Sequence, residues 1–193
     1  MITYPSQRTF AGGGCMCTSA AMYWAIACAS RMIMPDCSPE KMRILMEVAA
    51  ETQRAITLGL AQPSSYMLQQ HEVLEAIQLP SNLQGVEMYG YCSDLPTDMP
   101  NYIHVSEVHS LLKNGDAMVI TGGHHTTAVY CTSDSVYAYD SSPACVSRIG
   151  SAAELTDALL SAHSNMVQFT VTALRRHDKV HPRHAHAGSP ARA

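Results

Sequence analysis

The spacing of hydrophobic residues changes near Gly85, and this change constrains the fold more than any other feature of the chain. Before Gly85, apolar residues recur at helical spacing across 42–49, after the helix-start signal Ser38-Pro39-Glu40. After Gly85, apolar and polar residues alternate across 86–92, as they do in a half-buried strand. The sequence therefore predicts an α+β fold, in which a helical N-terminal half packs against an antiparallel sheet.

Caps, turns and helix breakers give the boundaries of the individual elements. Ser151 and Glu154, for example, have the spacing of a capping box. Helices are predicted at 20–29, at 39–52, from Ser64 or Ser65 to Pro80, at 106–113 and at 151–162. Strands are predicted at 85–92, 117–121, 126–132, 135–140 and 167–173.

Charge divides the chain into one domain and a tail. At 193 residues with 47% hydrophobic content, the chain is long enough to close a single core. Five bases fall in the last nineteen residues, which leaves seven bases and fifteen acids, a net charge of −8, in residues 1–174. We expect a folded domain at 1–174 and a disordered, basic, histidine-rich tail at 175–193. The acidic body argues against nucleic acid as the main partner and suits a basic one.

The seven cysteines do not indicate secretion, because the sequence does not open with a charged and then apolar leader. We therefore expect reduced thiols. The longest uncharged apolar run, Ala20 to Ala29, has ten residues, about half of the roughly 20 that span a bilayer. The sequence predicts a soluble protein without a membrane partner.

The stretch "SQRTFAGGGCMCTSAAMYWAIACA", from Ser6 to Ala29, places two cysteines where a buried helix begins. A helix N-terminus favours the thiolate, the nucleophilic form of cysteine, so Cys15 and Cys17 are both candidate nucleophiles. Glycines at 12–14 leave room for an extended, glycine-containing substrate to pass over the backbone. Gln7 carries a side-chain amide of the kind that stabilises an oxyanion in papain-like sites.

An acid–base partner for the thiolate is offered by "GGHHTTAVYCTSDSVYAYDSS". His124 or His125 opens one predicted strand and Asp140 closes the next, so neighbouring strands would bring imidazole and carboxylate together. Strand alternation puts His124 and His125 on opposite faces, and the sequence leaves open which ring faces the cysteine. We favour His125.

Each of these residues also has a structural interpretation. Free cysteines are most often small buried hydrophobes, and we expect this role for Cys28, Cys131 and Cys145. A metal site could use Cys15, Cys17 and the histidine pair, but the Cys-x-x-Cys spacing of ordinary zinc sites is missing, so we expect no metal or other cofactor. The combination of Gln, Gly-Gly-Gly-Cys, His and Asp in papain's chain order favours nucleophilic catalysis.

From about Ser6 to Leu160 the chain resembles the ubiquitin-specific cysteine protease domain of the herpesvirus large tegument protein, a papain-like family. The similar segments are "SQRTFAGGGCMCTSAAMY", the weaker "MEVAAETQRA" and "SSYMLQQHEVLEAI", and "AMVITGGHHTTAVYCTSDSVYAYDSSP". The resemblance implies that Cys15 is the nucleophile and Gln7 the oxyanion glutamine. It also implies a deubiquitinase that recognises ubiquitin, within a larger tegument protein found in the virion tegument and in the host cytoplasm and nucleus.

The chain departs from this family at one position. The family's second strand ends Asp-x-His, and that histidine is the general base, whereas this chain has Asp140-Ser141-Ser142. Either His124 or His125 has taken over as base, or the domain binds ubiquitin without catalysis. A papain-fold protease or acyltransferase with another substrate is a further alternative.

Overall fold

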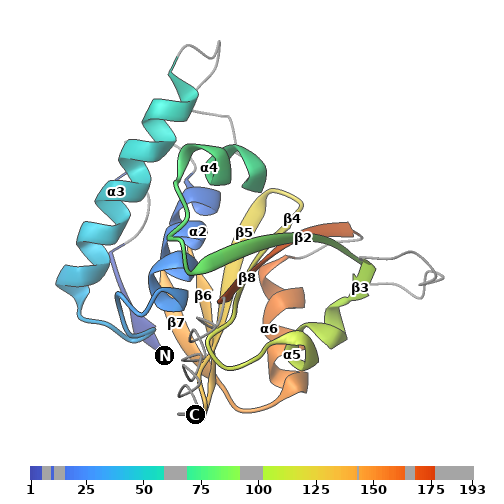
Figure 1. Ribbon diagram of the computed structural model, residues 1–193. Coiled ribbons are helices and arrows are strands. Elements are labelled where there is room, and N and C mark those ends of the chain that lie inside the picture. The colour runs from blue at the N-terminus through green and yellow to red at the C-terminus, as the bar shows by residue number, and fades with distance from the viewer. Residues whose placement is uncertain are drawn as a thin grey trace, which may run out of the picture.

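The computed structural model describes residues 1–5, 10, 16–58, 69–91, 102–142, 144–163 and 168–176 (Figure 1). Its helices are α2 (Cys17–Ala29), α3 (Pro39–Thr57), α4 (Gln70–Ala76), the 3-10 turn η1 (Val105–Glu107), α5 (Val108–Leu111) and α6 (Ala152–Ala162). Its strands are β1 (Ile2–Thr3), β2 (Leu83–Tyr91), β3 (Tyr102–His104), β4 (Ala117–Gly122), β5 (His125–Cys131), β6 (Val136–Asp140), β7 (Cys145–Ile149) and β8 (Gln168–Arg176). None of the helices in these ranges combines the length and the apolar composition that crossing a bilayer requires.

The strands form one sheet in the order β1-β7-β6-β5-β4-β8-β2-β3. Strands β4 to β7 form an antiparallel meander, and β8, the last strand in the chain, inserts between β4 and β2. The pairing of β2 with β3 is parallel, so the predicted antiparallel sheet has one parallel edge.

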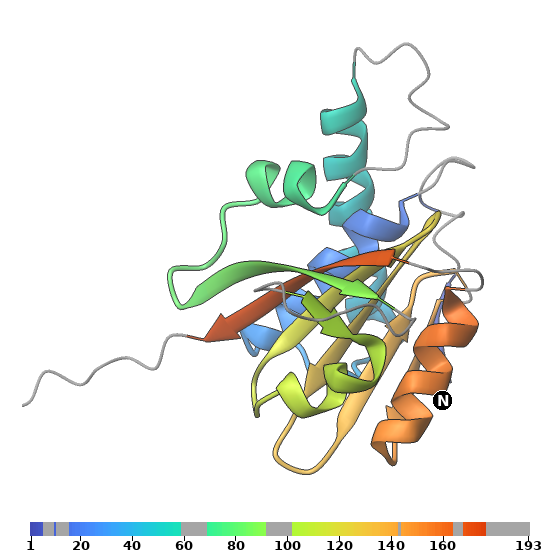
Figure 2. The same cartoon turned by 90° about the vertical axis from the view of Figure 1, so that its right-hand side faces the viewer.

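Helices cover both faces of this sheet. Figures 1 and 2 show α2, α3 and α4 on one face and α5 and α6 on the other. Each face has its own hydrophobic core, which β5 shares by alternation: Ala128 and Tyr130 belong to the α2 side, and Val129 belongs to the α6 side. The prediction of an α+β fold, with N-terminal helices packed against a sheet, is confirmed.

Helix α2 lies at the centre of the first core. Every residue of this helix except Tyr23 is buried, as the apolar run at 20–29 predicts. Its Trp24 stacks on Tyr139 of β6 with ring centroids 5.3 Å apart. Two polar side chains in its first turn form hydrogen bonds: Thr18 with Thr126 of β5, and Ser19 with Gln53 of α3. These contacts fix the start of α2 against the sheet on one side and against α3 on the other.

The helix predictions are largely confirmed, with shifted ends. The predicted helix at 39–52 is α3, with the Ser38 side chain accepting from the Lys41 amide, but it continues to Thr57. The α4 helix that the structure describes starts at Gln70 with a capping box of Gln69 and Glu72, while Ser64 and Ser65 lie outside the described residues. The segment 106–113 forms η1 and α5 instead of one helix.

The strand predictions missed three short strands, β1, β3 and β7. Strand β8 also runs two residues past the predicted domain boundary, since Arg175 and Arg176 pair with Gln84 and Leu83 of β2. These two arginines therefore belong to the sheet instead of the tail. Residues 177–193, the remainder of the predicted tail, lie outside the described part of the chain.

Candidate functional site

The tight hairpin between β4 and β5 positions the two candidate histidines. Gly122 is the last residue of β4, Gly123 turns the chain with φ of +61°, and His125 is the first residue of β5, opposite Gly122. Glycine adopts this left-handed conformation without a steric penalty. His124 lies exposed in the turn, whereas His125 is partly buried.

His125 forms a hydrogen bond with Asp140, the last residue of β6. Its Nε2 lies 2.7 Å from Asp140 Oδ1, and the two side chains are only 18% and 26% exposed. The strand register explains the contact: Asp140 pairs with Thr127, and His125 is two residues before Thr127, on the same face of the sheet. The bond occupies Nε2 and does not involve Nδ1 of His125.

The environment of Asp140 keeps its carboxylate ionised. Burial acts to raise the pKa of Asp140, but hydrogen bonds from His125 and from the Ser142 amide, together with the nearby imidazoles His125 and His163, outweigh it and lower the pKa. The Ser142 amide nitrogen lies 2.9 Å from the same Oδ1 that bonds His125. A carboxylate whose pKa is lowered in this way can orient the histidine and stabilise its imidazolium form.

The structure adds a residue that the sequence analysis missed. His163, the C-cap of α6, is 3% exposed, and its ring centroid lies 5.4 Å from that of His125. Its Nδ1 lies 3.1 Å from the Gly122 carbonyl oxygen and its Nε2 lies 3.0 Å from Thr127 Oγ1. Burial lowers its pKa. The only sequence signal was a histidine after a predicted helix, which is ordinary at a helix C-terminus.

The start of α2 lies at this same end of the sheet. Thr18 Oγ1 in the first turn is 3.0 Å from Thr126 Oγ1, one residue after His125. Thr126 is also 3.0 Å from Thr121 of β4, so the helix start is tied to both strands of the hairpin. Because adjacent strand residues alternate, α2 packs on the face of Thr126, and His125 projects on the face of Thr127.

The two predicted residues of the N-terminal motif, Cys15 and Gln7, lie outside the described residues. Cys17, the other candidate nucleophile, is described: it is the first residue of α2 and is 1% exposed. A polypeptide substrate cannot reach a thiol that is buried to this degree.

The other three cysteines, which we expected to be structural, lie in surroundings that disfavour the thiolate. Burial raises the pKa of Cys28 well above its usual value, and it also raises the pKa values of Cys131 and Cys145. All three are reduced. A raised pKa makes a poor nucleophile, so these positions fit packing better than chemistry.

No group of three or more histidine, cysteine, aspartate or glutamate side chains is arranged to hold a metal ion within the described ranges. One ligand of the metal site considered above, Cys15, lies outside those ranges, so that alternative is not tested.

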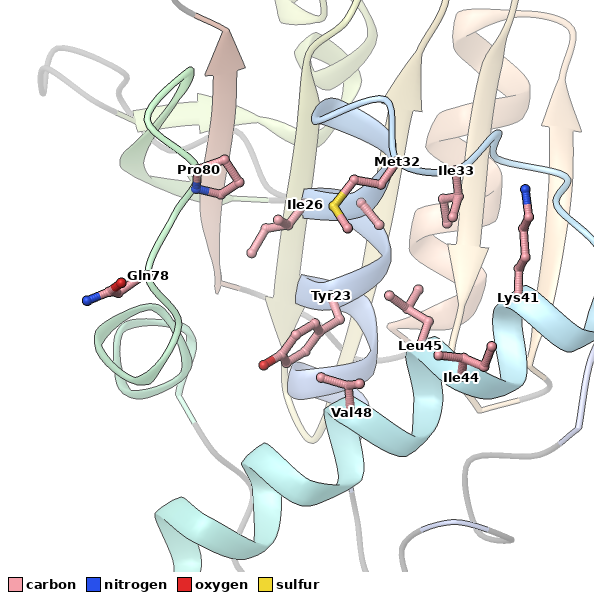
Figure 3. Close-up of a pocket in the computed structure, with 11 residues that line it drawn as sticks. Tyr23, Ile26, Met32, Ile33, Lys41, Ile44, Leu45, Val48, Gln78 and Pro80 are labelled. Carbon is pink, nitrogen blue, oxygen red and sulfur yellow. The ribbon is translucent and has the colours of Figure 1, made fainter.

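An apolar cavity of about 460 Å³ lies elsewhere, between α2, α3 and the segment after α4 (Figure 3). Ile26, Ile44, Leu45 and Val48 line it, and Lys41 is its one charged lining residue. None of its lining residues belongs to the His125 and Asp140 pair. We therefore place the candidate site at the hairpin end of the sheet.

Neither a family model nor a curated protein matches this chain. Among solved structures, it is similar to the ubiquitin-specific protease encoded by murine cytomegalovirus tegument protein M48, solved in complex with a ubiquitin-based suicide substrate. The match has a TM-score of 0.63 and 14% identity, and it covers 86% of this chain and 80% of that chain. The Pseudomonas avirulence protein AvrPphB matches with a TM-score of 0.46 and 10% identity, over 83% of this chain and 91% of that chain. At this identity the first match shows the fold alone: this chain shares the α+β fold of the murine cytomegalovirus protease.

Proposed function

We propose that this protein is a deubiquitinating cysteine protease that hydrolyses the bond after the C-terminal Gly-Gly of ubiquitin. The observation that carries the proposal is the hydrogen bond between His125 and Asp140, at the end of the sheet where α2 begins. An imidazole fixed by a carboxylate is one part of the machinery of thiol catalysis, and here it lies at the end of the sheet where α2 begins.

Cys15 is the proposed nucleophile. It is covalently bonded to Met16, which is fully buried and precedes α2, and consecutive Cα atoms lie about 3.8 Å apart. The contact of Thr18 with Thr126 holds this helix start beside the first residues of β5. This position of the helix start, at the same end of the sheet as His125, supports the choice of Cys15 as the nucleophile.

In the proposed reaction, His125 acts as base and acid in turn. His125 takes the thiol proton through Nδ1, and Asp140 stabilises the resulting imidazolium. The Cys15 thiolate attacks the carbonyl carbon of the terminal glycine, while Gln7 and the amides at the start of the helix hold the oxyanion. His125 then protonates the leaving lysine amine, and a thioester remains. His125 next removes a proton from water, which attacks the thioester and releases the ubiquitin carboxylate and the Cys15 thiol.

Three features support ubiquitin as the substrate. The similar murine cytomegalovirus protease was solved with a ubiquitin-based substrate. Glycines at 12–14 suit a substrate tail whose residues have no β-carbon. The acidic body, at −8 over residues 1–174, complements the arginines of ubiquitin's tail. By the same resemblance we assign the chain to a larger viral tegument protein.

Turnover of a fluorogenic ubiquitin conjugate tests the proposal. The wild-type protein should release the fluorophore, and Cys15→Ala should bind ubiquitin without release. Cys17→Ala is the matched control and should remain active, because Cys17 is buried. Full activity of Cys15→Ala, with loss in Cys17→Ala, would reverse the assignment of the nucleophile.

The exposed neighbour His124 gives a second matched pair. His125→Ala should abolish turnover and His124→Ala should preserve it, because His125 bonds Asp140 and His124 lies exposed in the turn. Equal activity of these two variants would refute the role of His125.

The alternative is a domain that binds ubiquitin without turnover. It is favoured by Ser142, which stands where the resembling family has its catalytic histidine, and by the placement of His125 on the face opposite α2. Ubiquitin binding by the wild-type protein, without release from the fluorogenic conjugate, would establish this alternative.

A further inference from the structure

We propose that His163 is a positioning residue that holds His125 and Asp140 in their catalytic arrangement. This inference rests on the proposed function, because it assigns a task to His163 within that reaction. His163 comes from α6, far along the chain from both groups, and it packs against the sheet at the candidate site.

His163 contacts the strand partners of both proposed catalytic residues. Its Nδ1 donates to the carbonyl of Gly122, which pairs with His125 across the β4–β5 ladder. Its Nε2 accepts from the hydroxyl of Thr127, which pairs with Asp140 across the β5–β6 ladder. A single buried ring therefore connects the backbone beside the imidazole to the residue beside the carboxylate.

His163 is not itself a candidate base. The Gly122 oxygen can only accept, so Nδ1 carries the ring proton and Nε2 must accept from Thr127. Both nitrogens are engaged, and the side chain is 3% exposed. Its contribution acts through the groups that it touches.

The neutral state of His163 matters because His125 becomes positively charged during the reaction. The two ring centroids are 5.4 Å apart, so a charged His163 would oppose the imidazolium of His125. Burial and the adjacent His125 favour the neutral form of His163, whereas its bond to Gly122 and the charge of Asp140 act in the opposite direction, and the net effect is a lowered pKa. In its neutral form, His163 can thus support the hairpin without placing a second positive charge beside His125.

Two substitutions separate the hydrogen bonds from the bulk of the ring. His163→Phe keeps a planar ring and loses both bonds, whereas His163→Gln keeps a donor for the Gly122 carbonyl and an acceptor for the Thr127 hydroxyl. For the fluorogenic ubiquitin conjugate, we expect kcat of His163→Phe to fall roughly 10- to 100-fold, the scale of a small misplacement of catalytic groups. KM should stay nearly unchanged, and His163→Gln should recover most of the lost kcat.

The partner residue provides an independent pair in case His163→Phe does not fold. Thr127→Val removes the hydroxyl that bonds His163 and should lower kcat, whereas Thr127→Ser retains the hydroxyl and should not. His71→Gln, at an exposed position of α4, is the control for loss of a histidine. A wild-type kcat in folded His163→Phe and Thr127→Val would overturn the inference, and so would an effect confined to KM.

A readout that needs no turnover distinguishes failure of this inference from failure of the proposed function. The imidazole nitrogen signals of His125 can be followed by NMR across a pH titration in the unliganded protein. In His163→Phe and Thr127→Val, the tautomer balance of His125 should change, and in His163→Gln it should stay near wild type. If the wild-type protein shows no turnover but the His125 signals change in these variants, then His163 positions His125 as proposed and the protease proposal fails. His125 signals that stay unchanged in every variant would refute the positioning role of His163.

Discussion

Asp140 accepts two hydrogen bonds on one oxygen, from His125 Nε2 and from the Ser142 amide. The Ser142 amide holds the Asp140 carboxylate in place, so the carboxylate can hold the His125 ring in one orientation. We expect Asp140→Asn to lower kcat on a ubiquitin substrate by at least about 100-fold, since an amide that donates to Nε2 imposes the wrong tautomer on His125. Measured kcat values and the fold, checked by circular dichroism, decide this prediction.

Asp134→Asn is the matched control for that substitution. Asp134 lies exposed in the turn after β5, in the same hairpin as Asp140 but at the opposite end of the strands. Its substitution should leave kcat unchanged. An Asp140→Asn protein with wild-type kcat would show that the pair is structural.

The buried His163 also predicts a pH dependence of stability. Its pKa in the folded protein is lower than the ordinary value of 6.5, so the unfolded chain binds a proton that the folded protein rejects. Folding is therefore favoured above pH 6.5, and this contribution is lost as the pH falls from 6.5 through the folded-state pKa. Thermal unfolding from pH 7 to pH 4 should show a weaker decline of Tm for His163→Gln than for the wild type. Parallel declines would mean that the buried ring is charged in the folded protein.

At the scale of elements, the packing of β2 against β8 depends on a glycine that leaves room for an aromatic ring. Gly90 pairs with Phe169, and a β-carbon added at Gly90 would lie 2.0 Å from the Phe169 ring. Phe169 is 3% exposed and belongs to the core on the α6 side, so the ring has little room to retreat. Gly90→Ala should lower the free energy of unfolding by about 1–3 kcal/mol, the range for an overpacked core. Urea denaturation measures the difference.

Gly85→Ala, in the same strand and facing the same neighbour β8, is the control. The nearest atoms to an added β-carbon there are 3.7 Å away, which is ordinary contact. It should leave the stability unchanged or raise it slightly, because alanine restricts the unfolded chain. Similar losses in both variants would indicate a general intolerance of β2 to side chains.

The longer helices and strands could be predicted from the sequence, whereas the short strands, which depend on pairing with segments far along the chain, could not. Helix α3 has apolar residues at helical spacing, and strands β4, β5 and β6 are runs of five to seven residues rich in strand formers and bounded by turn signals. Strand β7 has five residues, and Cys145 and Val146 are buried in succession, so its alternation is broken at the start. Strands β1 and β3 have two and three residues, too few for any period.

The candidate site divides in the same way. Chain order and strand ends were sufficient to pair Asp140 with a histidine, because the pairing of consecutive strands is local. The choice of His125 over His124 at Asp140 depended on the register, which the sequence left open. His163 could not be found, because its contact with Gly122 spans 41 residues and depends on how α6 packs on the sheet.

At the scale of the molecule, β8 determines where the domain can be shortened. It pairs with β2 along its whole length and with β4 from Phe169 to Leu174, and its Val171 and Leu174 belong to opposite cores. A chain ending at Arg176 should unfold at the same urea concentration as the full chain. A chain ending at residue 167 should show no cooperative unfolding, because two strands lose their partner and both cores lose side chains. Cooperative unfolding of the shorter chain would mean that β8 is dispensable.

The distribution of charge predicts how salt affects encounter with ubiquitin. Residues 1–176 carry nine bases and fifteen acids, a net charge of −6, whereas the full chain carries −4. Raising NaCl from 50 to 300 mM shortens the Debye length from about 14 to about 6 Å, so attraction to a basic ubiquitin tail weakens. We expect kcat/KM of the full chain to fall several-fold over this range, and to fall more steeply for the chain ending at Arg176. An uncharged fluorogenic Gly-Gly peptide should show little change, which separates encounter from a direct effect of salt on the site. If kcat/KM on ubiquitin stays constant or rises with salt, the acidic charge of the domain does not contribute to substrate recognition. Recognition would then depend on the Gly-Gly end of ubiquitin.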